Sequence, residues 1–322
     1  MKKRKLGTSG LELAPLALGG NVFGWTIDEP ASFQVLDAFA AAGFNFVDTA
    51  DMYSAWKPGN KGGESETILG NWMKKSGNRK EVLIATKVGM DMGAGQKGLS
   101  KDYILRAAEA SLRRLQTDYI DLYQAHTEDA TVPLQETLEA FGQLVKQGKV
   151  RAIGASNYSA LRLSEALEVS KKHGLPRYES LQPLYNLYDR AEFETILEPV
   201  CRENGIGIIP YYSLASGFLT GKYRSEADLA KSARGPGVKK YLNARGFRIL
   251  EALDQTATKY NSTPTKISLA WLLSRPAVIA PIASATNVTQ LRELLDATNL
   301  DLAREAIELL DRASANQASA PH

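Results

Sequence analysis

The sequence predicts a single (β/α)8 barrel, and three observations support this fold class. Eight short apolar runs alternate with longer amphipathic segments, as repeated βα units require. The runs are nearly continuous in hydrophobicity, which is typical of strands buried on both faces. No composition break or Pro/Gly-rich linker divides the 322 residues. We therefore expect one TIM barrel domain over 1–322, with an open doubly wound sheet as the alternative architecture.

The predicted strands are runs of β-branched and other apolar residues bounded by turn-forming residues. They cover Leu13–Gly20, Phe44–Thr49, Val82–Lys87, Ile120–His126, Arg151–Ala155, Glu179–Leu184, Ile206–Tyr212 and Val278–Ser284. Between them, Tyr103–Leu115 and Leu134–Lys146 show helical spacing, and Gly148 is the expected stop of the second helix. Such helices supply the crossovers that parallel strands need.

Two segments fall outside the eightfold pattern. Residues 4–14 carry Gly7-Thr8-Ser9-Gly10 between short apolar stretches, which predicts a β-hairpin that plugs the N-terminal end of the barrel. The segment Arg224–Arg245 is the longest insertion and follows the seventh strand, on the face where barrel enzymes keep their sites. We expect this segment to form a mobile lid.

Charge and cysteine content exclude several classes of partner. With 39 basic and 36 acidic side chains spread along the chain, there is no basic footprint for nucleic acid, so a small molecule is the expected partner. The single cysteine, Cys201, fits a reducing compartment. Neither the N-terminal residues nor Ile206–Leu219 resembles a signal peptide or a membrane span. We expect a cytoplasmic protein without a membrane partner, and the oligomeric state stays open.

Known cofactor and metal signatures are missing from the sequence. No GxGxxG fingerprint follows a first strand and no GxxxxGK[ST] loop occurs, which disfavours a Rossmann site. His126, His173 and His322 are far apart and lack the spacing of helical ligand pairs. We therefore expect no metal.

Polar residues that follow the strands are the catalytic candidates, because barrel enzymes act at the C-terminal ends of their strands. Lys87 ends an apolar run and would need a counter-ion when buried, for which Asp48 is suitable. The ammonium is expected to lower the pKa of a nearby Tyr53 hydroxyl and so make it a better acid. His126 could hydrogen-bond a carbonyl oxygen. Taken singly, each residue also has an ordinary structural interpretation as a turn, packing or core residue.

Several segments resemble, in order and spacing, the motifs of aldo-keto reductases. They are Phe46–Tyr53 (FVDTADMY), Ala85–Lys87 (ATK), Asp121–His126 (DLYQAH), Gly154–Asn157 (GASN), Ser180–Pro183 (SLQP), Gly217–Lys222 (GFLTGK) and Ala280–Thr286 (APIASAT). The resemblance covers nearly the whole chain. It implies a catalytic tetrad of Asp48, Tyr53, Lys87 and His126, in which the tyrosine protonates a carbonyl oxygen as hydride arrives from a nicotinamide.

The same resemblance implies a cofactor site for NADP(H), with NAD(H) possible. Ser156, Asn157 and Gln182 are expected to bind the nicotinamide carboxamide, and Tyr211, rather than Tyr212, to stack on the ring. The remaining cofactor residues that it implies are Gly20, Asn21, Asp48, Ser213, Leu214, Ala215, Gly217, Leu219, Lys222, Ala283, Ser284, Ala285, Thr286, Asn287, Gln290 and Glu293. Many relatives carry arginine at the position of Gln290 and asparagine at that of Leu294. Two frequent contacts to the 2′-phosphate and adenine are therefore missing.

The expected function is the reduction of aldehydes or ketones to alcohols. One alternative is a nicotinamide-binding regulatory subunit, because potassium-channel β subunits share the barrel and the tetrad. Another is a sugar or polyol dehydrogenase that runs the same chemistry in reverse. Trp25 and Trp56 could line an aromatic carbonyl pocket or serve only as packing residues, and the sequence does not identify the substrate.

Overall fold

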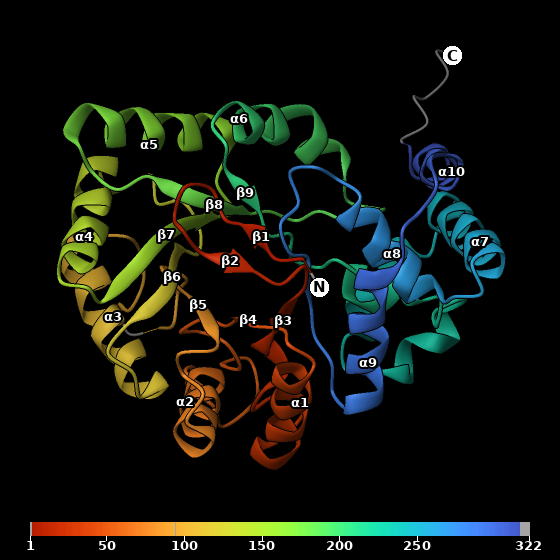
Figure 1. The fold of residues 1–322 in the computed structure, drawn as a ribbon, viewed down its shortest axis with the longest axis horizontal. Coiled ribbons are helices and arrows are strands. Elements are labelled where there is room, and N and C mark those ends of the chain that lie inside the picture. Colours follow the sequence, from red (N-terminus) through yellow and green to blue (C-terminus); the bar gives the residue numbers. More distant parts are fainter. Residues whose placement is uncertain (1, 94, 316–322) are drawn as a thin grey trace.

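Eight parallel strands form a barrel that is surrounded by helices (Figure 1). The computed structural model describes residues 2–93 and 95–315, so His322 lies outside the described residues. The strands are β3 (Ala17–Gly19), β4 (Phe46–Asp48), β5 (Leu83–Val88), β6 (Ile120–Ala125), β7 (Val150–Ser156), β8 (Tyr178–Gln182), β9 (Gly207–Ile208) and β10 (Ile282–Ala283). Their order in the sheet is β10-β3-β4-β5-β6-β7-β8-β9. The predicted α/β barrel is confirmed.

Backbone hydrogen bonds between β9 and the chain leading into β10 close the sheet. Ile208 forms a parallel bridge with Val278 and accepts a hydrogen bond from Ile279 N at 2.8 Å. Further along the same two segments, Ile282 N donates to Pro210 O at 2.9 Å. The first and last strands of the open order are thus joined, so the described sheet has no long free edge at this seam.

Prolines shorten three of the predicted strands. Leu13 pairs with Arg4 in a hairpin, and the first barrel strand begins only at Ala17, after Pro15. The seventh and eighth predicted strands are reduced to β9 and β10, which lie beside Pro210 and Pro281. Proline has no N–H for the ladder. Hydrophobic runs therefore predicted the strand positions but overestimated their lengths.

A two-stranded hairpin covers one end of the barrel, as predicted. Its strands are β1 (Arg4–Lys5) and β2 (Glu12–Leu13), which lie across the middle of the ring in Figure 1. Leu6, Leu11 and Leu13 are buried with the interior side chains of the strands. Thr8 donates from its N–H and its hydroxyl to Glu179, at 2.7 and 2.8 Å, near the start of β8. The covered end is therefore the N-terminal end, which leaves the opposite end for the site.

The helices follow local sequence signals. They are α1 (Glu29–Ala41), α2 (Glu64–Ser76), α3 (Lys101–Leu115), α4 (Leu134–Lys146), α5 (Ala160–His173), α6 (Glu198–Glu203), α7 (Ala244–Lys259), α8 (Pro264–Leu273), α9 (Val288–Asp296) and α10 (Arg304–Ser314). Thr263 and Asn287 cap α8 and α9 with their side chains. As predicted, α4 stops just before Gly148, which has a φ of 72°. Within the described residues, no helix is long and apolar enough to cross a bilayer.

Candidate active site

The four predicted tetrad residues meet at the C-terminal end of the barrel. Asp48 is the last residue of β4, and Tyr53 lies in the turn that follows it. Lys87 lies near the end of β5, and His126 comes directly after β6. Three adjacent strands therefore bring together side chains that are up to 78 positions apart in the sequence.

Lys87 is completely buried, and its ammonium has three hydrogen-bond acceptors. The Nζ atom donates to Asp48 Oδ2 at 2.7 Å, to the Thr49 carbonyl at 2.8 Å and to the Tyr53 hydroxyl at 2.7 Å. An ammonium has three N–H bonds, so its donor capacity is fully used. The close carboxylate compensates the loss of hydration that burial imposes on the charge.

Asp48 is the second centre of this network. Its Oδ2 accepts from Lys87 and, at 3.3 Å, from the Tyr53 hydroxyl. Its Oδ1 accepts from Gln182 Nε2 at 2.9 Å and from Gln124 Nε2 at 3.5 Å. The carboxylate is thereby held in one orientation by four donors. Gln124 was not predicted as a site residue, although it precedes His126 by two positions and therefore points into the same barrel interior.

A strained turn holds Tyr53 over this pair. Ser54 has a φ of 74° and is completely buried. Its hydroxyl donates to Phe23 O at 2.7 Å, and its carbonyl accepts from Asn60 Nδ2 at 3.0 Å. A left-handed serine costs about 1–3 kcal/mol unless its surroundings enforce it. The contacts of Ser54 therefore stabilise a strained backbone, and this backbone fixes the direction of the Tyr53 ring.

The predicted lowering of the Tyr53 pKa is wrong in this structure. Burial, the charge of Asp48 and the hydrogen bond to that carboxylate raise the pKa of Tyr53 well above its usual value, and only Arg234 among the major causes lowers it. Burial also lowers the pKa of Lys87, although Asp48 opposes this effect. The sequence argument counted the ammonium but not the loss of water and the shared carboxylate.

His126 completes the group as a neutral imidazole. Burial, followed by the charge of Lys87, lowers the pKa of His126 well below its usual value. Its ring centroid lies 6.0 Å from that of Tyr53, in an edge-on arrangement. The backbone fixes the residue on both sides, since His126 N donates to Val88 O at 2.8 Å and His126 O accepts from Asn157 Nδ2 at 2.9 Å. A neutral imidazole still has one N–H to donate.

A pocket of about 780 Å³ opens above these residues. Asp48, Tyr53 and His126 line it, whereas Lys87 lies behind them. Fifteen of the residues that were predicted for the cofactor line the same pocket. They are Asn21, Asp48, Ser156, Asn157, Gln182, Tyr211, Ser213, Leu214, Gly217, Lys222, Ala283, Ser284, Thr286, Gln290 and Glu293.

Five other predicted cofactor residues are not among those that line the pocket. Ala215, Leu219 and Ala285 are completely buried in the core. Gly20 is also buried, and its carbonyl accepts from Ser65 Oγ at 2.8 Å. Asn287 caps α9 through Gln290 N at 2.9 Å. Any contact of these five residues with a cofactor stays a prediction.

The predicted lid lies over the pocket. Its two short 3-10 helices are Glu226–Lys231 and Gly235–Tyr241, and the turn between them contributes Arg234 to the lining. Arg234 donates to Asn21 Oδ1 at 3.2 Å, and Ser284 Oγ donates to the same oxygen at 2.7 Å. This contact joins the lid to the ends of β3 and β10. The mobility of the lid stays a prediction.

Sequence reasoning missed several lining residues on the lid and around the mouth. Lys231, Ser232, Ala233 and Arg234 belong to the predicted lid but were not singled out, and Met52 and Met90 also line the pocket. Tyr212, which was considered and set behind Tyr211 for stacking on the ring, lines it too. Trp56 lines it as well, whereas Trp25 packs edge-on against Trp56 with the ring centroids 5.6 Å apart. The cluster of basic residues between 222 and 234 was the available signal for a site that binds anions.

Comparison with known proteins agrees with this geometry. Residues 15–315 match the aldo/keto reductase family, a span that includes all four tetrad positions. The chain belongs to the aldo/keto reductase family. It is 34% identical over 320 residues to the uncharacterized oxidoreductase YrpG of Bacillus subtilis, which covers 97% of this chain and 95% of that protein. The aldo-keto reductase YhdN of the same bacterium is 34% identical over 321 residues, covering 95% and 91%.

A third relative of this aldo/keto reductase is named for a different role. The probable voltage-gated potassium channel subunit beta of Arabidopsis thaliana is 32% identical over 308 residues, covering 93% of this chain and 92% of that protein. Aldo/keto reductases are oxidoreductases that use nicotinamide cofactors in general. Because the chain belongs to this family and its relatives include an oxidoreductase and an aldo-keto reductase, we assign it to the enzymes.

Proposed function

We propose that this aldo/keto reductase reduces aldehydes or ketones to alcohols with NADP(H), and that Tyr53 is the proton donor. The hydrogen-bonded group of Tyr53, Lys87 and Asp48 at the base of the pocket carries this proposal. The group offers a protonated hydroxyl to the pocket and keeps the Lys87 ammonium directly behind it. Few structural roles require a completely buried lysine at that point.

Tyr53 remains protonated until the substrate reacts, because its raised pKa disfavours the phenolate. The nicotinamide, when bound, supplies the hydride that forms the new C–H bond. The electron pair of the carbonyl moves to its oxygen, which takes the proton from the Tyr53 hydroxyl and becomes an alcohol. The hydrogen bond from Lys87 Nζ to Tyr53 then stabilises the negative charge left on the phenolic oxygen until solvent returns a proton.

His126 orients the carbonyl in this proposal. As a neutral imidazole on the pocket wall beside Tyr53, it can donate its single N–H to the carbonyl oxygen. A protonated imidazole would compete with Tyr53 as the acid, and burial together with the charge of Lys87 disfavours that form. The two side chains therefore divide orientation and proton transfer between them.

The residues that line the pocket fit a nicotinamide dinucleotide. Ser156, Asn157 and Gln182 offer hydroxyl and amide groups for a carboxamide, and the Tyr211 ring lies beside them, with its hydroxyl donating to Asn157 Oδ1 at 2.8 Å. With the cofactor bound, Gln182 would still donate from Nε2 to Asp48 and would use its amide oxygen as the acceptor for the carboxamide.

Three cations near the lid fit the phosphates of the dinucleotide. The pocket is lined by Lys222, Lys231 and Arg234. Burial lowers the pKa of the Arg234 guanidinium. Further along, Thr286 and Gln290 line the pocket at the start of α9. The pyrophosphate that these cations would bind is common to NADP(H) and NAD(H), so the preference for NADP(H) rests on the family resemblance. NAD(H) stays possible, since Gln290 brings no charge to the place expected for the 2′-phosphate.

Titration of the protein with NADPH and with NADH tests the cofactor assignment. Each titration follows cofactor fluorescence and is completed by adding an activated aromatic aldehyde to the same sample. Tight binding followed by oxidation of the reduced cofactor is the expected result. The ratio of the two dissociation constants measures the cofactor preference, and a protein that binds neither dinucleotide would refute the proposal.

The variant Tyr53→Phe tests the proton donor. We expect kcat to fall by about 10²–10⁴-fold, because the acid is lost, while NADPH affinity changes little. Tyr119→Phe, at the opposite end of β6, is the matched control and should retain wild-type turnover. Carbonyl reduction by Tyr53→Phe at the wild-type rate would show that another group provides the proton.

The similarity to a potassium channel β subunit supports one alternative, a regulatory nicotinamide-binding subunit. Turnover separates the two functions. Cofactor binding without aldehyde reduction over a broad substrate panel would favour the regulatory role. A preference for oxidising sugar or polyol alcohols with NADP⁺ would instead favour a dehydrogenase that uses the same four residues in reverse.

A further inference from the structure

The loop after β9 contains unusual backbone conformations beside the proposed nicotinamide position. Tyr212, Ala215 and Ser216 have φ values of 52°, 47° and 58°. Residues with a Cβ rarely adopt this left-handed region, and they do so only where neighbouring groups enforce it. The carbonyl of Tyr212 accepts a hydrogen bond from a side chain that comes from a different strand–helix connection.

That side chain is Asn186, in the connector formed by residues 183–190 after β8. Asn186 is completely buried. Its Nδ2 donates to Tyr212 O at 3.1 Å and to Asp189 Oδ2 at 3.2 Å. Its Oδ1 accepts from Tyr188 N and Asp189 N, each at 2.8 Å. Both N–H bonds and both acceptor positions of the amide are thus used, so the side chain has one defined orientation.

The Asn186 contact acts on the peptide that follows Tyr212, the residue next to Tyr211. The carbonyl of Tyr212 accepts a second hydrogen bond from Ala215 N at 2.7 Å, so two donors define its direction. Tyr211 itself is tied to the same connector, because its N–H donates to Pro183 O at 3.0 Å. The connector therefore holds the main chain on both sides of the Tyr211 ring.

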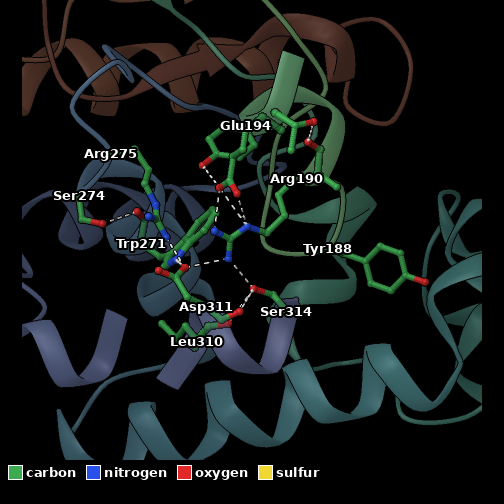
Figure 2. A network of polar contacts seen from close by, with 12 residues as sticks. Tyr188, Arg190, Glu194, Trp271, Ser274, Arg275, Leu310, Asp311 and Ser314 are labelled. Carbon is green, nitrogen blue, oxygen red and sulfur yellow. Dashed lines mark hydrogen bonds and ion pairs between the residues drawn. The ribbon is translucent and has the colours of Figure 1, made fainter. Parts of the chain in front are cut away.

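The connector has its own rigid anchor at its far end. Figure 2 shows Arg190 between Glu194 on one side and Asp311 and Ser314 on the other. Arg190 Nε donates to both carboxylate oxygens of Glu194 at 2.9 Å, and NH1 donates to Asp311 Oδ1 at 2.8 Å and Ser314 Oγ at 2.7 Å. A planar guanidinium bound in this way leaves little freedom to the chain that carries it.

We propose that Asn186 is a positioning residue of the reductase: by holding the Tyr212 carbonyl, it keeps the Tyr211 ring where the nicotinamide stacks. This inference rests on the proposed function, since it concerns the cofactor site. Asn186 does not line the pocket and contacts no reacting atom. Its effect passes through the main chain of Tyr212.

The variant Asn186→Ala is compared with Asn45→Ala, which is the matched control. Asn45 is also a buried asparagine whose amide binds two backbone groups, but it lies under the hairpin at the opposite end of the barrel. Both variants should lose thermal stability. Only Asn186→Ala should lower kcat at saturating aldehyde and weaken NADPH binding, each by about tenfold or more. Equal kinetic losses in the two variants would overturn the proposal.

A double-mutant cycle distinguishes positioning from a general loss of structure. Glycine adopts positive φ without strain, so Tyr212→Gly makes the turn independent of its enforcing side chain. Adding Asn186→Ala to Tyr212→Gly should therefore cost less than threefold in kcat. The same tenfold loss in both backgrounds would refute the role assigned to Asn186.

A crystal structure of Asn186→Ala provides a readout that does not need turnover. We expect Tyr212 to leave the left-handed region and the Tyr211 ring to shift, and an unchanged loop would overturn the positioning role. Failure of the wild-type protein to bind or oxidise NADPH would count against the proposed function alone. The positioning role of Asn186 and the proposed reductase function can therefore be refuted independently.

Discussion

Asp51 shows how a single buried carboxylate can act against stability. It lies two positions before Tyr53 and is almost completely buried. Burial, followed by the negative charge of Glu66, raises the pKa of Asp51 to about 7, although Arg114 and Lys87 act in the opposite direction. The folded state therefore retains a proton that the unfolded chain releases near pH 4.

The stability of the protein should depend on pH through this residue. The contribution of protonated Asp51 is fully present below about pH 4 and is lost as the pH rises through about 7. Asp51→Asn should raise the free energy of unfolding by about 2–4 kcal/mol at pH 8 relative to wild type and less at pH 5, because an amide needs no ionisation. Urea unfolding at both pH values measures the difference. A constant difference would contradict the raised pKa.

Gln290 is the residue at which cofactor preference can be tested. Its Oε1 accepts from the N–H and the hydroxyl of Thr286, both at 2.9 Å, on the pocket wall. Gln290→Arg places a cation at the position expected for the 2′-phosphate and should tighten NADPH binding by about tenfold. NADH is the internal control, and an equal gain for both cofactors would show that position 290 does not face the 2′-phosphate.

Among the elements, α10 depends on one carboxylate for its attachment to the barrel. Asp311 Oδ1 accepts from Arg190 NH1 at 2.8 Å and from Trp271 Nε1 at 2.9 Å, and it also pairs with Arg275 (Figure 2). Burial acts to raise the pKa of Asp311, but the Trp271 hydrogen bond and the two guanidinium groups hold it below its usual range. One side chain thus links α10, α8 and the connector.

Asp311→Ala should lower the free energy of unfolding by about 2–3 kcal/mol at neutral pH, because three donors lose their shared acceptor. Since the pKa of Asp311 is lowered on folding, this loss should disappear as the pH falls below about 4. Asp296→Ala removes a largely exposed pair with Lys266 and is the control, with an expected change below about 1 kcal/mol. Equal losses for the two variants would reject the anchoring role.

The local sequence predicted the place of the lid but not its contact with the barrel. Turn residues and charges predicted the lid as one insertion, and the structure places it over the pocket. Its contact with the barrel depends on Arg234 meeting Asn21, which lies 213 positions earlier in the chain. No local pattern contains that pairing, because the two residues are far apart in the sequence.

For the whole molecule, we propose a single domain that unfolds cooperatively. The strands from β3 to β10 share one barrel, and a hydrophobic core surrounds it on all sides. Urea unfolding followed by far-UV circular dichroism and by tryptophan fluorescence should give one coincident transition. The tryptophans lie in separate parts of the barrel, at the pocket mouth, in α2 and in α8. Two separated transitions would reveal independently folding parts.

The tetrad shows which parts of the site could be predicted. Asp48, Lys87 and His126 were found because each is a polar residue at the end of an apolar run, and parallel strands bring their ends to one face. Tyr53 was a candidate because it follows Asp48 in the same turn, whereas the roles of the cofactor residues came from the resemblance to a family. Gln124 and Asn186 were not found, because an amide in a strand or a loop has no distinctive pattern until its partners are known.

The sequence by itself determined the positions of the eight strands, the hairpin, two of the helices with the stop at Gly148, and the order of the candidate catalytic residues, because hydrophobic period, turn chemistry and strand polarity are local properties. Only the tertiary structure decided where the prolines shorten the strands, how the barrel closes between β9 and β10, and that the pKa of Tyr53 rises. These outcomes depend on burial and on charges from distant segments. Such effects exist only after the chain has enclosed them.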